Sequence, residues 1–585
     1  MRKLMGQFTL ALLAFIALAT SGTVPALAAP PCATLANNPA NGIAGASGIK
    51  SASSAVVAAN GPNAAYCLVK LLYGTNPNQN INILVALPLS AADGGQGGVQ
   101  GAWNGRTQGV GGGGCAGVAA VNPAMSAAVN GGYAASGNDL GHSGGDCEPG
   151  VNADGTYNLQ FIDDFIRNGI KQQVLLSKSI TKSYYGTRAV YNYWNGCSTG
   201  GRQGYLLAQE LGDELDGVLA NAPAIYWTRF QTAQMWGEIA MKQLASGPIA
   251  PAKLAQAAVS AVKACDAADG VTDGIVEDPR TCTFSAKANI CGAPNAPAQN
   301  CLTATEADAV DKIWDGPRNK RKNKIWFGLD RGSDFFILDG PAPFALGVTQ
   351  FHWNEHNRNF DWQTVSLDQY PQVAQDGSRN IADVTDTFKP LDRFKAHGGK
   401  LLTWVGANDQ FIYPRGVINY YRQMASRYSR HDRPDFANLQ DFYRLFRAPG
   451  VGHCGFNSAG PVPVDPFGAL VNWVEHNVPP QTLLASGGSA APPAGRTRPL
   501  CPYPQRAIYS GAGSINVASS FYCGDNVETQ EIVCNDTLTR YKHEVHGRLD
   551  FDDTGVNARL CRTDDRDDDH DDDHHHGHKD KVARD

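Results

Sequence analysis

At 585 residues, with 43% hydrophobic residues, the chain exceeds one ordinary domain and holds enough apolar side chains for well-packed cores. We therefore expect two domains, or one domain with a large insertion. The net charge is −6, but residues 564–585 alone carry ten Asp against four Lys or Arg, so the rest of the chain is close to neutral. A near-neutral body without a basic patch argues against nucleic-acid binding.

The first 28 residues have the pattern of a signal peptide. Arg2 and Lys3 precede an apolar run at 10–19, and Ala26-Leu27-Ala28 resembles a cleavage site. A membrane anchor would need about 20 apolar residues, and this run is shorter. We expect the mature chain to begin near Ala29 and to be secreted or periplasmic. Residues 29–60, rich in Ala, Gly, Asn and Ser, suggest a loosely structured leader.

A glycine loop follows the strand expected at 82–88. Residues 111–114 are four consecutive glycines. They could form a linker. Alternatively, they form an oxyanion loop, in which a backbone N–H of Gly112 or Gly113 faces the negative charge that develops during ester cleavage.

The segment 189–211 predicts a strand, a sharp turn and a helix. The turn is Gly196-Cys197-Ser198-Thr199-Gly200, which matches the nucleophile elbow of α/β-hydrolases. Gly-x-Ser-x-Gly alone arises easily in a chain with 64 glycines, so the evidence lies in the strand and helix around it. Ser198 is the candidate nucleophile, and the N–H of Thr199 is the second candidate oxyanion donor.

Two later strands end in the matching partners. An apolar run at 400–408 ends at Asp409, and a run at 442–451 ends at His453. The order Ser, Asp, His predicts an α/β-hydrolase, with His453 as base and acid and Asp409 as its orienting group. Cys197 precedes the serine and Cys454 follows the histidine. If the triad assembles, these cysteines lie close enough for a disulfide; the alternative is two unrelated buried cysteines.

Ser198 and Asp409 are much further apart in the sequence than the roughly 60–90 residues that two or three β-α units need. We therefore predict a catalytic α/β core at 29–224 and 396–500 and an inserted lid domain at 225–395. The second half of the lid is rich in aromatic residues, some of which could line a cleft for a phenolic group. We expect a linker at 480–500, a disulfide-tied appendage at 501–563 and a disordered Asp/His-rich tail at 564–585.

The lid contains an acidic turn. Asp266, Asp269 and Asp273 lie on a short glycine-containing loop, where the backbone carbonyls of Val271 and Ile275 could complete an oxygen shell for a hard cation. The order of residues along this loop does not match the ligand pattern of an EF-hand. A solvated Asp-Gly turn is the alternative, and the residues alone do not decide between the two.

Taken together, these motifs resemble the tannase and feruloyl esterase family, which also contains mono(2-hydroxyethyl) terephthalate hydrolases. The resemblance spans about residues 60–525 and includes Trp103-Asn-Gly-Arg106, the glycine loop, Cys197-Ser-Thr-Gly-Gly-Arg202 and Gly452-His-Cys-Gly455. It implies a serine carboxylesterase acting on feruloyl, galloyl or terephthaloyl esters through an acyl-enzyme. It also implies that the acidic turn holds a structural Ca²⁺.

Fourteen cysteines in an exported protein predict disulfides, and the absence of Cys-x-x-Cys argues against zinc ribbons. Proximity in sequence and the resemblance together suggest five pairs, and leave open Cys115 with Cys147 and Cys534 with Cys561. The five are Cys32–Cys67, Cys197–Cys454, Cys265–Cys282, Cys291–Cys301 and Cys501–Cys523.

Two other functions fit less of the sequence. A secreted binding protein could use an esterase scaffold or its metal-attracting tail, but an intact triad argues against it. A peptidase on the same triad lacks support from the resemblance. A terephthalate monoester would need an arginine for its free carboxylate, for which Arg331, Arg358 and Arg379 are candidates. Sequence alone does not give the oligomeric state.

Overall fold

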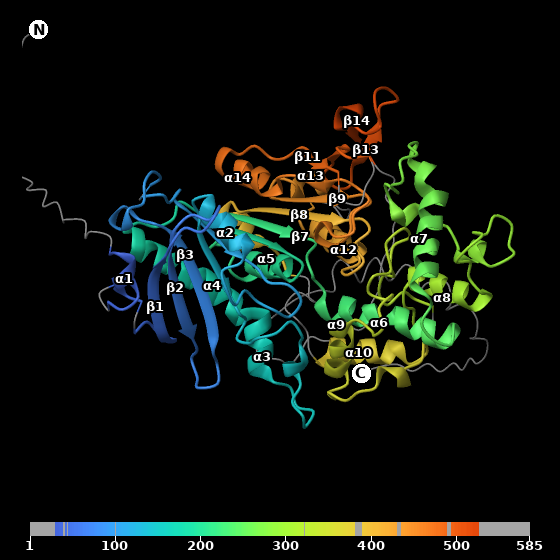
Figure 1. The fold of residues 1–585 in the computed structure, drawn as a ribbon, viewed down its shortest axis with the longest axis horizontal. Coiled ribbons are helices and arrows are strands. Elements are labelled where there is room, and N and C mark those ends of the chain that lie inside the picture. The colour runs from blue at the N-terminus through green and yellow to red at the C-terminus, as the bar shows by residue number, and fades with distance from the viewer. Residues whose placement is uncertain are drawn as a thin grey trace, which may run out of the picture.

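The computed structural model describes residues 30–525 except 39–40, 44, 100, 321, 381–388, 430–434 and 488–492. The proposed signal peptide, the Asp/His-rich tail, Cys534 and Cys561 lie outside the described residues. A mixed sheet of nine strands forms the centre of the fold (Figure 1). In spatial order its strands are β1 (Ile49–Val57), β2 (Tyr66–Tyr73), β3 (Ile81–Pro88), β5 (Ala134–Asn138), β4 (Arg106–Val110), β6 (Tyr191–Cys197), β7 (Gly217–Asn221), β8 (Lys400–Gly406) and β9 (Tyr443–Ala448).

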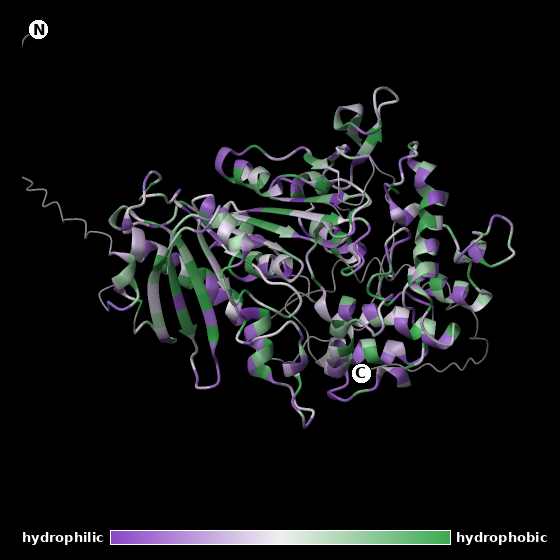
Figure 2. Cartoon of the chain, in the orientation of Figure 1, coloured by the Kyte–Doolittle hydropathy of each residue, from purple (hydrophilic) through white to green (hydrophobic). Residues whose placement is uncertain are grey.

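The sheet is antiparallel from β1 to β5 and parallel from β5 to β9. Parallel strands are buried on both faces, and their side chains alternate between the two. On β8, Leu401 and Val405 belong to the core on one face, whereas Leu402 and Trp404 pack on the other with Trp473. Figure 2 shows the hydrophobic residues that run along these strands. The carboxyl ends of the parallel strands therefore form one edge, at which loop residues converge.

Helices cover both faces of the sheet. One core contains side chains of α4 (Gly169–Tyr185), α5 (Thr199–Glu210) and α12 (Pro414–Arg427), and the opposite one contains α14 (Pro466–His476). The shorter helices are α1 (Cys32–Leu35), α2 (Pro123–Asn130), α3 (Leu159–Asp163), α11 (Asp392–His397) and α13 (Phe436–Leu439). This layered arrangement is the α/β-hydrolase fold that the motif order predicted.

A large insertion separates β7 from β8. In Figure 1 its helices lie beyond the arrowheads of β7 and β8, at the carboxyl edge of the sheet. They are α6 (Trp227–Leu244), α7 (Pro251–Cys265), α8 (Ala304–Asp315), α9 (Ala345–Asn354) and α10 (Tyr370–Asn380). These helices lie between β7 and β8, in the part of the chain expected to form a lid, and their action as a lid stays a prediction.

Two expectations about irregular segments were wrong. Residues 49–57 form the edge strand β1, because an edge strand needs backbone pairing on one side only and tolerates small side chains. Residues 480–500 contain β11 (Leu483–Ser486) and β12 (Thr497–Leu500), which join β10 (Val462–Pro463) in a second sheet. The buried Leu483, Ala485 and Leu500 anchor this sheet against the core, which composition alone did not reveal.

Within the described residues, six disulfides tie the fold together. They are the five pairs suggested above and Cys115–Cys147. Cys501–Cys523 fixes a small hairpin of β13 (Arg506–Tyr509) and β14 (Phe521–Gly524). Six disulfides are typical of proteins that fold in an oxidising compartment. The described part of the chain contains no helix with the length and hydropathy of a membrane span.

Candidate active site

Ser198 occupies a sharp turn between β6 and α5. Its φ of 61° lies in the left-handed region, which a non-glycine residue adopts only at a cost. The turn brings backbones so close that a Cβ on Gly196 would lie 2.5 Å from the backbone of Gly200. Glycines are therefore required around the serine, and Ser198 is held at the N-terminus of a helix, as in a nucleophile elbow.

Asp409 and His453 follow β8 and β9 at the same edge of the sheet. Nδ1 of His453 lies 2.8 Å from Oδ2 of Asp409. The Asp409 side chain is fully buried, and its Oδ1 accepts the N–H groups of Phe411 and Ile412, each at 2.9 Å. Because these bonds fix the carboxylate, the proton of the neutral imidazole is held on Nδ1. The Nε2 atom is then left to accept a proton from a nucleophile.

The Cys197–Cys454 disulfide connects the two catalytic loops. Its Cα atoms are 6.1 Å apart, and its two cysteines adjoin Ser198 and His453. Cys454 has a φ of 52°, so the histidine loop turns sharply where it meets the serine loop. The disulfide thus ties the loop of Ser198 to that of His453, which contacts Asp409, and the catalytic role of the three residues stays a prediction.

The glycine loop lies against the start of α5, since the N–H of Gly200 donates to the carbonyl of Gly112 at 2.9 Å. The N–H of Gly112 donates to Oε1 of Gln203 at 3.2 Å, and that of Gly113 donates to the carbonyl of Ala116 at 3.1 Å. Both candidate glycine donors therefore have partners within the protein. Their oxyanion role stays a prediction, and it requires one of these bonds to yield to substrate.

Thr199 is the first residue of α5, whose first N–H groups have no partner within the helix. Its hydroxyl donates to the carbonyl of Gly114 at 2.5 Å, which holds the glycine loop beside the elbow. The role of Gln203, which is buried, was missed from the sequence. Its position four residues after Thr199, on the same helix face, is the signal that could have suggested it.

Four phenylalanines form an aromatic cluster beside the histidine: Phe336 and Phe344 from the insertion, and Phe411 and Phe456 from the catalytic loops. The Phe411 ring lies 5.0 Å from that of His453, and the rings of Phe336 and Phe344 lie 5.6 and 5.3 Å from Phe411. Phe456 lies 5.2 Å from Phe336. Phe336 and Phe456 are 43% and 48% exposed, so the cluster presents aromatic surface to solvent next to the triad.

The other aromatic residues of the insertion's second half are mostly core. Trp326, Phe327, Phe335, Phe351 and Trp353 are buried. The sequence pattern pointed to aromatic residues of the insertion alone and missed Phe411 and Phe456, which lie outside it.

The candidate arginines do not point to a carboxylate site. Arg331 donates to the carbonyl of Phe284 at 2.6 Å, and its guanidinium lies over the Trp314 ring. Arg358 lies 3.6 Å from Glu148 of a core loop. The side chain of Arg379 lies outside the described residues.

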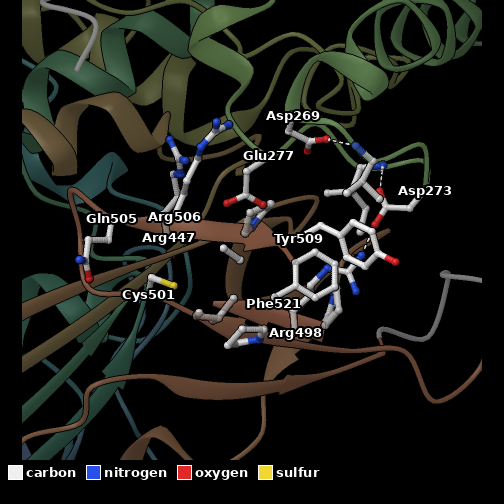
Figure 3. Close-up of a pocket in the computed structure, with 17 residues that line it drawn as sticks. Asp269, Asp273, Glu277, Arg447, Arg498, Cys501, Gln505, Arg506, Tyr509 and Phe521 are labelled. Carbon is white, nitrogen blue, oxygen red and sulfur yellow. Dashed lines mark hydrogen bonds and ion pairs between the residues drawn. The ribbon is translucent and has the colours of Figure 1, made fainter. Parts of the chain in front are cut away.

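The acidic turn lines a pocket shared with the C-terminal hairpin (Figure 3). Asp269, Val271, Asp273, Ile275 and Glu277 face it from the turn, opposite Arg447, Arg498 and Arg506. Burial raises the pKa values of Asp269 and Asp273. Asp266 lies behind the turn, where its carboxylate accepts the N–H groups of Asp273 and Gly274, each at 3.0 Å.

The turn suits a hard cation in the kind of ligand it offers. The carboxylates of Asp269 and Asp273 are partly buried and line one pocket, and a positive charge would offset the cost of keeping them ionised there. Arg498 already pairs with Asp273. Within the described residues no three His, Cys, Asp or Glu side chains are placed to hold a metal together, so backbone carbonyls would have to complete the shell.

Comparison with known proteins agrees with this geometry. The family model described as tannase and feruloyl esterase matches residues 99–334 and 342–524. The "Probable feruloyl esterase" of Arthroderma benhamiae is 34% identical over 418 residues, covering 67% of this chain and 75% of that protein. The "Probable feruloyl esterase B-2" of Aspergillus terreus is 28% identical, covering 67% and 76%.

Solved structures share the fold. Feruloyl esterase B from Aspergillus oryzae superposes with a TM-score of 0.70 at 24% identity, over 81% of this chain and 96% of that one. Tannin acyl hydrolase from Aspergillus niger gives a TM-score of 0.72 at 23% identity, over 85% and 97%. Motifs, fold and family match agree: this chain belongs to the tannase and feruloyl esterase family and is a carboxylic ester hydrolase of that type.

Proposed function

We propose that the protein hydrolyses esters of neutral aromatic acids, of the feruloyl or galloyl kind, through an acyl-enzyme on Ser198. The observation that carries this proposal is the aromatic cluster packed beside His453, with exposed rings at Phe336 and Phe456. An aromatic acyl group bound there lies next to the residue that moves the proton. The names of the relatives, feruloyl esterases and a tannin acyl hydrolase, support the same substrate class.

In this mechanism Ser198 Oγ attacks the ester carbonyl while Nε2 of His453 takes the serine proton. The negative oxygen of the tetrahedral intermediate is stabilised by the N–H of Thr199 and by one N–H of the glycine loop. His453 then returns the proton to the alkoxide, and the alcohol leaves. Water, deprotonated by His453, attacks the acyl-enzyme, and the proton passes to Ser198 as the acid is released. Asp409 stabilises the imidazolium in both steps.

The charges near the aromatic cluster favour a neutral acyl group over a terephthalate monoester. A free terephthalate carboxylate needs a cation, and Arg331 is bound instead to the carbonyl of Phe284. Asp334, whose carboxylate accepts the N–H of Phe336, adds an acid beside the aromatic cluster. A carboxylate brought here would be repelled, whereas a phenol would not.

We also propose that the acidic turn holds a structural Ca²⁺, with the carboxylates of Asp269 and Asp273 and the carbonyls of Val271 and Ile275 as its ligands. Asp266 would join them only if its carboxylate released the N–H groups of Asp273 and Gly274. The ion would stabilise the insertion and take no part in the chemistry. Export through a signal peptide at 1–28, to the periplasm or medium, completes the proposal and accords with the disulfides.

Hydrolysis of methyl ferulate, methyl gallate and mono(2-hydroxyethyl) terephthalate by wild type and Ser198→Ala, in calcium-containing buffer, tests the function. We expect turnover of at least one of the first two esters, abolished in the variant, and little turnover of the terephthalate monoester. A wild-type enzyme that prefers the terephthalate monoester would refute the neutral-acyl proposal.

A further inference from the structure

One carboxylate of the insertion, that of Asp334, contacts both catalytic loops. Its Oδ2 accepts Nε2 of Gln410 at 3.2 Å and Nδ2 of Asn457 at 3.1 Å. Gln410 follows the catalytic acid, and Asn457 lies four residues after the catalytic histidine. One side chain of the insertion therefore contacts both the loop that carries Asp409 and the loop that carries His453.

Gln410 passes this contact on to the histidine. Its side chain is fully buried, and its Oε1 accepts the backbone N–H of His453 at 3.0 Å. A buried amide that has both its donor and its acceptor engaged has little freedom to rotate. The chain of contacts from Asp334 through Gln410 thus fixes the backbone of His453, next to the strained turn at Cys454.

The same carboxylate also holds the aromatic cluster. Oδ1 of Asp334 accepts the N–H of Phe336 at 3.1 Å. The Phe336 ring packs on Phe411, which in turn packs on the imidazole of His453. Residues 335–341 lie between the two stretches that the family model matches, so the position of Phe336 is a feature of this chain rather than of that match.

We propose that Asp334 is a positioning residue that couples the insertion to the catalytic histidine, so that the ring surface that receives the acyl group and the base that moves the proton share one anchor. This inference rests on the proposed function. Asp334 acts through Gln410 and the backbone of His453, and it touches neither substrate nor reacting atoms. Its loss should therefore slow turnover even for an ester whose acyl group is too small to reach Phe336.

The test compares Asp334→Ala, Asp334→Asn and Gln410→Leu with wild type, using p-nitrophenyl acetate and methyl ferulate at temperatures well below each Tm. We expect kcat for both esters to fall by about 10–100-fold, since small displacements of a catalytic group are costly. Asp334→Asn should retain part of the activity, because its amide oxygen still accepts a hydrogen bond. The double variant Asp334→Ala/Gln410→Leu should lose little more than the worse single variant, as expected for residues in one network.

Asp339→Asn is the matched control, because Asp339 is an exposed acid on the same segment; it should leave kcat unchanged. The inference is overturned if Asp334→Ala and Asp334→Asn keep wild-type kcat on p-nitrophenyl acetate, or if only KM for methyl ferulate changes. It is also overturned if the two single losses simply multiply in the double variant. If the folded wild type shows no Ser198-dependent hydrolysis, the proposed function and this inference both fail. If the wild type hydrolyses the esters and the Asp334 variants keep its kcat, only this inference fails.

Discussion

The disulfide between Cys197 and Cys454 joins the residue before the candidate nucleophile to the residue after the candidate base, across 257 positions of sequence. It closes a loop that contains the whole insertion, and it ties the turn of Ser198 directly to the turn of His453. Covalent closure and the Asp334 contacts act on the same loop, at His453.

Removing this disulfide should lower activity more than its effect on stability alone would explain. For Cys197→Ala/Cys454→Ala we expect kcat to fall by about 10–100-fold at a temperature where the variant is still folded, because the catalytic loops loosen. Stability should also drop, by about 2–4 kcal/mol. The matched control is Cys291→Ala/Cys301→Ala, which opens a loop of only 10 positions within the insertion. Equal kcat in the two double variants would contradict this prediction.

Asp409→Asn should leave the fold intact and reduce kcat by roughly 10⁴-fold. The asparagine oxygen can still accept the N–H groups of Phe411 and Ile412, which keeps the loop in place. Its NH₂ then faces Nδ1 of His453 and selects the tautomer with the proton on Nε2, where it cannot accept the serine proton. Steady-state kinetics, with circular dichroism to check folding, would measure this. Retention of more than a tenth of the wild-type kcat would count against Asp409 as the orienting residue.

Phe336→Ala should raise KM for methyl ferulate about fivefold and leave the kinetics of p-nitrophenyl acetate nearly unchanged. The ring offers about 1 kcal/mol of aromatic contact that an acetyl group cannot use. Tyr522→Ala removes a similarly exposed aromatic side chain from the C-terminal hairpin and serves as the control. A parallel loss on both esters would place Phe336 outside acyl recognition.

Removal of Ca²⁺ by a chelator should lower the stability of the protein without acting directly on the triad. If the free Ca²⁺ concentration is about 100-fold above the Kd of the acidic turn, removal of the ion costs on the order of 3 kcal/mol of stability, and EDTA should lower Tm. Asp269→Asn should start from a lower Tm and respond little to EDTA. Differential scanning calorimetry with and without added Ca²⁺ distinguishes these cases. An EDTA-insensitive wild type would favour the solvated-turn alternative.

Glu238 in α6 should make stability depend on pH. It is 9% exposed, and burial raises its pKa from 4.5 to about 7. A carboxyl with a raised folded-state pKa contributes stability that is full below pH 4.5 and is lost as the pH rises through about 7. Glu238→Gln should therefore be more stable than wild type at pH 8, by about 3 kcal/mol, with a smaller difference at pH 5.

Glu306→Gln provides a comparison of opposite sign, since the contact with Lys253 lowers the pKa of Glu306 and the substitution should destabilise at neutral pH. Chemical denaturation at several pH values measures both effects. A difference between Glu238→Gln and wild type that does not change with pH would contradict the assignment.

The residues that sequence predicts well are those whose chemistry is tied to local geometry. Ser198 needs small neighbours to adopt its strained turn, and Asp409 and His453 follow apolar strands, so each leaves a pattern within ten residues. Gln410 left no such pattern, because its role depends on contacts made across the fold, and Gln203 left only its spacing from Thr199. Likewise, β11 and β12 read as a linker because their burial depends on α14, which the composition of 480–500 does not reveal.

Trapping the acyl-enzyme tests the central claim most directly. Wild type and Ser198→Ala would be mixed with p-nitrophenyl ferulate, quenched in acid within the first turnovers, and analysed by intact and peptide mass spectrometry. We predict the mass of one feruloyl group on the wild-type peptide that contains Ser198, and none on the variant. Label on another residue, or rapid wild-type hydrolysis that Ser198→Ala leaves unchanged, would contradict a serine acyl-enzyme at this site.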